Sequence, residues 1–233
     1  MKKNHILKKL RKLVKVKRKK HHVLIHRIHK DYNISRKTLF YVKEYGTHSN
    51  VIRTIIKESI FILIIASLLS SFGGLSLEYI KKIFLSFIPL IILIPVLNDM
   101  IGNYGTVISS KFSTMLHEGK IKKNVFLDKK VRLLFTQIFL IAIFTVIIAC
   151  IASFLISKML GHPADKITMY KILFICLIDV SLLIVILFLI AIFAGIYLYK
   201  KKEDPNNFLI PITTSIADFG NMIILSILVW LMF

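Results

Sequence analysis

"YKILFICLIDVSLLIVILFLIAIFAGIYLY" occupies residues 170–199 and decides the class of fold. Its only charged side chains are Lys171 and Asp179. A helix that crosses the hydrocarbon core of a bilayer needs roughly 20 mainly apolar residues. The stretch also lacks the regular alternation of polar and apolar residues that marks a barrel strand. We therefore expect it to be a membrane-spanning α-helix.

Similar apolar runs occur elsewhere in the chain. The sequence is 56% hydrophobic with a mean hydropathy of +0.72, yet its formal net charge is +21, so apolar and basic residues must be segregated. The expected fold is all-α and integral to the cell membrane, with the chain crossing it five times. The five predicted spans lie at about 59–76, 83–117, 131–157, 170–199 and 207–233.

The basic residues predict the domain organisation and the orientation. Of the 33 Lys and Arg residues, 18 lie within residues 1–57. We expect a basic cytosolic tail over residues 1–51, including an amphipathic helix, and a transmembrane domain over residues 52–233. Outside the spans, 27 Lys and Arg residues fall on one side of the membrane and five on the other. By the positive-inside rule, the N-terminus is cytosolic and the C-terminus lies outside.

Three carboxylates fall within the predicted spans: Asp99, Asp179 and Asp218. Charge inside a membrane is expensive, so such residues usually face a bundle interior or an aqueous pathway. Asp218 lies about 13 residues after Pro205, where we expect the last helix to begin, or roughly 20 Å along it. That places it near the middle of the bilayer. Asp179 has no polar neighbours at helical spacing, so a structural role is at least as well supported for it.

Polar residues form a stripe on each of two predicted helices, the second and the fifth. Their spacing of three and four residues places them on one face of each helix. The second helix has Asp99, Asn103, Thr106, Ser110 and Ser113, flanked by Asn98, Gly102 and Gly105, and the fifth has Pro211, Thr214, Asp218 and Asn221, with Ser215 beside them.

Prolines are concentrated in the same two helices. Pro89, Pro95 and Pro211 are all expected inside these spans, where each removes an amide donor and frees a carbonyl one turn earlier. Such backbone is tolerated in a membrane where it lines a cavity. The stripes carry oxygen ligands without Cys or His, a donor set that suits hard cations such as Mg²⁺. Polar residues of this kind also serve simply as hydrogen bonds between helices.

Two motifs resemble a known family. "GNYGTVISSKFSTMLHEG" (residues 102–119) and "EDPNNFLIPITTSIADF" (residues 203–219) resemble the membrane domain of MgtE-type magnesium transporters. They are most similar to the branch shared with the animal solute-carrier magnesium transporters, and the resemblance covers about residues 52–233. It implies five helices per unit, assembled as a two-fold dimer or a tandem pair around one central pore. The second and fifth helices line that pore.

The resemblance also implies roles for individual residues. Asp218 matches the fifth-helix aspartate that holds hydrated Mg²⁺, and Asn103 and Thr214 match pore-lining positions. The inclusion of Asp99 among the metal ligands rests on the stripe alone. This tail is too short and too basic to be the cytosolic Mg²⁺-sensing modules of bacterial members. The remaining expected pore-lining residues are Asn98, Gly102, Thr106, Ser110, Pro211, Ser215 and Asn221.

The resulting hypothesis is transport of Mg²⁺ or a similar divalent cation through the pore of a homodimer. No nucleophile–base pair, Walker loop or redox motif is present, so we do not expect an enzyme, and Mg²⁺ is the transported ion rather than a cofactor.

The alternative hypothesis is a membrane-anchored protein whose basic tail binds lipid, nucleic acid or a partner. A basic amphipathic helix binds anionic headgroups. No aromatic residue occurs within residues 1–30 to stack on bases, so specific nucleic-acid binding is not expected. The residues expected to face lipid are Lys8, Lys9, Arg11, Lys12 and Lys15.

Overall fold

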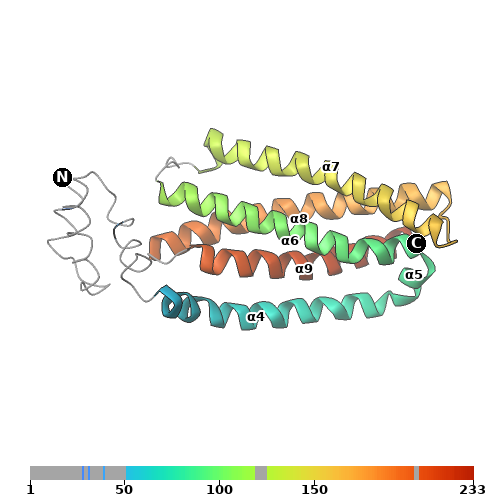
Figure 1. Ribbon diagram of the computed structural model, residues 1–233, viewed down its shortest axis with the longest axis horizontal. Helices are drawn as coiled ribbons and strands as arrows, with labels where there is room; N and C mark the ends of the chain where they lie inside the picture. The colour runs from blue at the N-terminus through green and yellow to red at the C-terminus, as the bar shows by residue number, and fades with distance from the viewer. Residues whose placement is uncertain (1–27, 29–30, 32–38, 40–50, 119–124, 202–204) are drawn as a thin grey trace.

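The computed structural model describes residues 28, 31, 39, 51–118, 125–201 and 205–233. Within these ranges all regular structure is helical (Figure 1), and five helices are long and apolar enough to cross a membrane. The prediction of an all-α fold with five spans is therefore confirmed. The predicted tail helix, with its lipid-facing cations, lies outside the described residues. The five long helices are α4 (Val51–Tyr79), α6 (Ile88–His117), α7 (Lys129–Met159), α8 (Lys166–Lys201) and α9 (Pro205–Met232).

Local sequence explains where several helices begin. The Asp128 carboxylate accepts a hydrogen bond of 2.9 Å from the Lys130 amide and caps α7. The Asp165 carboxylate accepts hydrogen bonds from the amides of Ile167 (3.2 Å) and Thr168 (3.3 Å) and caps α8 in the same way. Both satisfy amides that have no partner within the helix. As predicted, α9 begins at Pro205.

The second span differs from its prediction. A span beginning near residue 83 is wrong, because the chain forms the short helix α5 (Lys81–Ser86) and then turns at Phe87, which has an extended backbone, before α6 begins. Pro89 accounts for the break, since it has no amide to donate to the carbonyl of Leu85 and its ring would collide with that carbonyl. Pro89 therefore lies in the first turn of α6, where no helical partner is lost. Pro95 and Pro211 are inside helices as expected.

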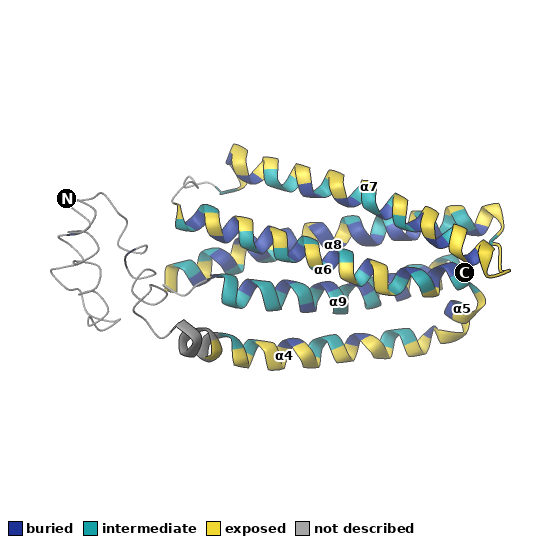
Figure 2. Cartoon of the chain, in the orientation of Figure 1, coloured by how far each residue is buried: buried dark blue, intermediate teal, exposed yellow. Residues whose placement is uncertain are grey.

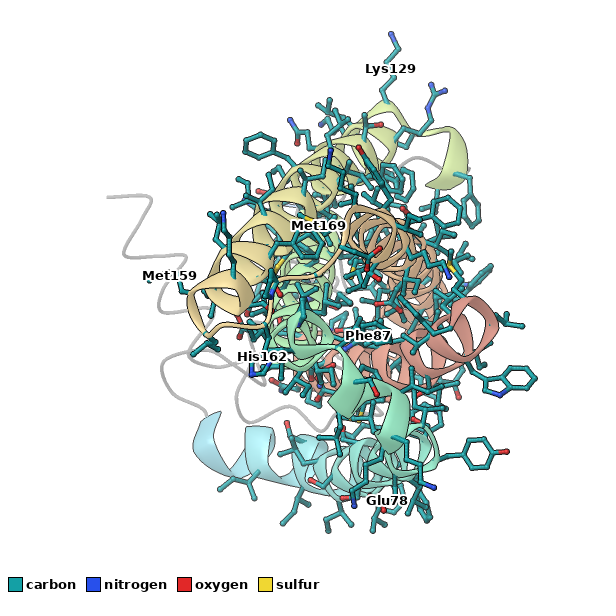
Figure 3. The ribbon with its side chains drawn as sticks, turned by 90° about the vertical axis from the view of Figure 1, so that its right-hand side faces the viewer. Glu78, Phe87, Lys129, Met159, His162 and Met169 are labelled. Atoms are coloured by element: carbon teal, nitrogen blue, oxygen red, sulfur yellow. The ribbon has the colours of Figure 1, made fainter. Side chains whose placement is uncertain are left out.

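Helices α6, α8 and α9 form the core of the bundle. Each packs against the other two, and α7 covers α6 and α8. Figure 3 looks along the bundle from the end with Glu78, Phe87 and His162, and α6 lies among its three neighbours. The buried faces of these helices contrast with the largely exposed surface of α4 (Figure 2). Helix α4 lies at the edge and makes its main contact with α9, so α9 has partners on opposite sides.

Candidate functional site

The polar stripe on α6 is largely uncovered in the single chain. Asp99 and Asn103 are exposed, whereas Thr106 and Ser110 are half-buried. The amide of Asn103 donates a hydrogen bond of 3.1 Å to the Asp99 carboxylate, so the two side chains act as one polar group. Asp99 lies about 16 Å along the helix from Ile88 at 1.5 Å per residue, which is well within the span. A carboxylate therefore stands on the outer surface of a membrane helix.

The last member of this predicted stripe points inward. Ser113 is fully buried, and its hydroxyl has no hydrogen-bond partner among the described residues. The polar surface of α6 that is at least partly exposed therefore runs from Asp99 to the half-buried Ser110, and the exposed Thr114 continues it.

The polar face of α9 is partly covered by neighbouring helices. Asp218, Thr214 and Pro211 are half-buried, whereas Ser215 is buried. The Thr214 hydroxyl donates to the carbonyl of Ile210 at 2.9 Å, and the Ser215 hydroxyl donates to that of Pro211 at 2.7 Å. These hydroxyls thus satisfy backbone oxygens around the proline.

Helix α4 supplies the neighbour of Asp218. The Ser70 side chain lies beside the Asp218 carboxyl group. Two further contacts follow the same parallel register: Ser59 donates to the carbonyl of Asn207 at 3.2 Å, and the hydroxyls of Ser76 and Ser226 lie 3.3 Å apart. A line of serines on α4 therefore accompanies α9 along most of its length.

Helix α6 lies against α9 through a second polar seam. The Asn221 amide donates to the side-chain oxygen of Asn98, and the hydroxyls of Ser109 and Thr213 are 3.0 Å apart. Close approach here depends on Gly105, where an added Cβ would lie 3.2 Å from the Cβ of Thr213. Asn98, Asn221, Ser109 and Thr213 are at least partly buried, so they hold the two helices together in the single chain.

This seam also sets the relative depth of the two carboxylates. The helices run antiparallel, and Asn98 pairs with Asn221 while Ser109 pairs with Thr213. Asp99 and Asp218 each lie within one turn of the first pair, so they stand at similar depth in the span. The surface beside Gly102, one turn after Asp99 on α6, is open, because a Cβ added there would meet no atom within 4 Å. The single chain thus holds an exposed and a half-buried carboxylate at similar depth.

Asp179 belongs to a different environment. It is fully buried on α8, and neither carboxylate oxygen has a hydrogen-bond partner among the described residues. Cys176 lies three residues before it on the same helix, and the thiol of Cys176 lies close to that of Cys150 on α7. Both cysteines are buried. Asp179 is therefore set apart from the two stripes.

The arrangement does not form a closed metal site in one chain. In the described part of the molecule, no three His, Cys, Asp or Glu residues come together as potential ligands. The oxygens on α6 and α9 are carboxylate, amide and hydroxyl groups spread along two helices. Such a surface can hold a hard cation through its water shell more readily than by direct coordination on all sides.

Sequence reasoning missed the residues that position the stripes. Ser59 and Ser70 were overlooked because isolated serines in an apolar run give no periodic signal. Ser109 and Thr213 each lie next to a stripe residue, and only the packing of α6 against α9 reveals that they meet.

The fold and these polar helices define a class of protein: a multi-pass integral membrane protein with carboxylate, amide and hydroxyl groups inside its membrane-spanning helices. Residues 94–228, more than half of the chain, match the MgtE family of divalent cation transporters. The chain belongs to that family, which is a family of transporters and not of enzymes. Neither a curated protein nor a solved structure matched the chain.

Proposed function

We propose that this protein moves Mg²⁺ across the membrane through a pore lined by α6 and α9 of two copies of the chain. The observation that carries the proposal is the exposure of Asp99 and Asn103 in the middle of α6. A carboxylate facing lipid at this depth is strongly unfavourable. A second copy placed against this face replaces lipid with a polar, hydrated pathway.

The ion ligands in this proposal are Asp218, Asp99, Asn103 and Thr214. Mg²⁺ dehydrates reluctantly and is usually held by one or two carboxylates while it keeps several waters. Two chains would present two copies of each oxygen around one axis, which suits a hydrated ion. Asn98, Asn221 and Ser215 support the pore walls from within each chain, since they are half-buried or buried.

No coupled energy source is needed for inward movement. A divalent cation gains about 4.6 kcal/mol per 100 mV of inside-negative potential, twice the value for a single charge. Transport down the electrochemical gradient therefore suffices, and it requires only a pathway and an ion site.

The decisive experiment compares Asp218→Asn with wild type in proteoliposomes that contain a Mg²⁺-sensitive dye, under an inside-negative potential. Hydrogen bonds to a charged group are worth about 1.5–3 kcal/mol, so the variant should lose at least about tenfold in flux. Asp165→Asn is the matched control, because it makes the same chemical change in the connection before α8. Equal flux in Asp218→Asn and wild type would refute the proposed ion site.

A binding readout separates an ion-site defect from misfolding. Mg²⁺ that binds the folded protein raises its melting temperature by mass action. The increase should appear in wild type and Asp165→Asn and disappear in Asp218→Asn, while all three melt at similar temperatures without Mg²⁺.

The dimer is tested by cross-linking on the exposed stripe. Asn103→Cys should form a cross-link between chains with a short thiol-reactive bridge. Leu140→Cys is the control, since Leu140 is 63% exposed on α7, away from the stripe. The native cysteines are buried and should react little. Cross-linking that is equally strong at both positions would contradict the proposed interface.

A further inference from the structure

A groove between α7 and α8 suggests a binding site for lipid. A groove of about 230 Å³ lies between the first turns of α7 and the second half of α8. Its walls are apolar side chains, and the rings of Phe135 and Phe188 lie 5.0 Å apart, centre to centre. Val185 and Leu189 form the α8 rim and are 41% and 39% exposed. The groove therefore opens sideways from the bundle, toward the space that lipid occupies.

The groove has a cationic end. Arg132 lines this end and is exposed. Lys129 and Lys130, which precede it in the first turn of α7, are exposed as well. No carboxylate pairs with Arg132 in the part of the chain that the structure describes. The nearby Asp128 is buried, and its carboxylate accepts a hydrogen bond from the Lys130 amide as the cap of α7. The positive charge of Arg132 is therefore not neutralised by a carboxylate of the described residues, and it is available to bind an anionic group.

The cationic end lies where the bundle meets the membrane surface. The 3₁₀ turn η1 (Val125–Leu127) precedes α7, at the same end of the bundle as the last turns of α8 (Figure 1). Phe126 of η1 packs near Phe193 of α8, with ring centres 5.9 Å apart, and both rings are partly exposed. The long apolar run of α7 begins directly after Arg132. The groove consequently runs from the interface into the hydrocarbon region.

We propose that this groove binds an anionic phospholipid, with an acyl chain along Phe135, Val185 and Leu189 and the phosphate against Arg132. An acyl chain fits the groove because the lining is apolar and lies within the span. An anionic headgroup fits its end because the guanidinium can hold a phosphate through two parallel hydrogen bonds. Basic pockets between helices on the cytosolic side are a known form of lipid recognition, and the positive-inside rule assigns this end to the cytosol.

The proposal is independent of the transport pathway. The groove is formed by α7, α8 and η1, whereas the polar stripes lie on α6 and α9. The lipid-binding proposal requires only that the chain spans a membrane. An experiment can therefore refute lipid binding without refuting Mg²⁺ transport, and can refute transport without refuting lipid binding.

The test uses a photoreactive phosphatidylglycerol, with the reactive group in its acyl chain, in vesicles that contain the full-length protein. We expect labelling of α7 and α8 peptides that line the groove, found by mass spectrometry. Unlabelled phosphatidylglycerol should compete for this label and phosphatidylcholine should not. Equal competition by the two lipids would overturn the proposal, because it would leave no role for the cationic end.

Two variants test the two parts of the site. Arg132→Gln should reduce the preference for the anionic lipid about fivefold, the effect of one cation at a membrane surface. Leu189→Trp should fill the groove and abolish labelling of its walls while it leaves the charge unchanged. Lys200→Gln is the matched control, since it removes an exposed cation at the same end of the bundle, outside the groove.

A different occupant would be recognised in the same samples. If a second copy of the chain fills the groove, Leu189→Cys will cross-link to its partner chain and lipid will not label the groove, which overturns the proposal. If Lys200→Gln weakens the lipid preference as much as Arg132→Gln does, the binding reflects general surface charge, and the proposed site is again excluded.

Discussion

The hydroxyl of Ser59 on α4 donates a hydrogen bond of 3.2 Å to the carbonyl of Asn207, the carbonyl to which Pro211 cannot donate. In a regular helix the amide of residue 211 would bond to this oxygen, but proline has no amide hydrogen. A neighbouring helix thus supplies the donor that the proline removes. The bond fixes the register of α4 along α9 at the first turn of α9.

We predict that Ser59→Ala destabilises the protein by about 0.5–1.5 kcal/mol, the net contribution of a typical hydrogen bond. In a Pro211→Ala background the same change should cost much less, because the amide of residue 211 restores the helical bond. Thermal unfolding of the four proteins in one detergent measures this coupling. Additive losses would show that Ser59 and Pro211 act independently.

Helix α4 approaches α9 closely at Gly73. A Cβ added there would lie 3.2 Å from the Cα of Phe219 and 2.9 Å from the sulfur of Met222. Gly73→Ala should therefore push the helices apart and cost about 1–3 kcal/mol, as overpacking does. Gly74→Ala is the internal control, since a Cβ there meets nothing within 4 Å and alanine favours a helix by up to about 1 kcal/mol. Melting temperatures that fall equally in both variants would disprove the close contact.

Asn98 and Asn221 are hydrogen-bonded to each other, so we expect their contributions to the stability of the protein to be coupled. Asn221→Leu leaves a polar group of Asn98 without its partner between two helices, a cost of about 1–3 kcal/mol. Replacing both residues with Leu should recover part of that loss, because no polar group is then stranded. Stability of the single and double variants tests this, and a double variant worse than the sum of the singles would contradict it.

Asp179 should be dispensable for transport. A buried carboxylate without a partner is costly, so Asp179→Asn should leave the melting temperature unchanged or raise it. Flux should remain at the wild-type level, in contrast to Asp218→Asn. A loss of Mg²⁺ flux in Asp179→Asn would instead place a third carboxylate in the pathway.

The cap of α8 should respond to acid. Hydrogen bonds from the Thr168 side chain and from the backbone amides of Thr168 and Ile167 hold the pKa of Asp165 below its usual value. A lowered folded-state pKa means that the stabilisation is present above the unfolded pKa and is lost as pH falls through the folded one. Hydrogen exchange at Ile167 and Thr168 should accelerate in that range, after correction for intrinsic rates. Asp165→Asn should lack this acid-dependent step, and retention of the step would implicate another group.

Much of the fold was predictable because membrane helices follow from local sequence. A bilayer interior supplies no hydrogen-bond partners, so apolar runs must form helices or barrel strands, and the length and evenness of these runs favour helices. The break at Phe87 was missed because the apolar run continues through it, and it is the position of Pro89 that separates α5 from α6.

The candidate site was predictable only in part. Helical periodicity alone placed Asp99, Asn103 and Thr106 on one face of one helix. It could not show that Ser113 turns inward while Asn103 remains exposed, because periodicity gives relative angles and not the direction of the neighbours.

The sequence by itself determined which segments cross the membrane and which residues share a face of each helix, because both depend on the geometry of a single helix. Only the tertiary structure decided that Ser70 meets Asp218, that Asn98 meets Asn221, and that Asp179 is buried away from both stripes. Those contacts join residues more than a hundred positions apart or depend on packing from several helices. They are set by the register and the close approach of whole helices, which no local pattern encodes.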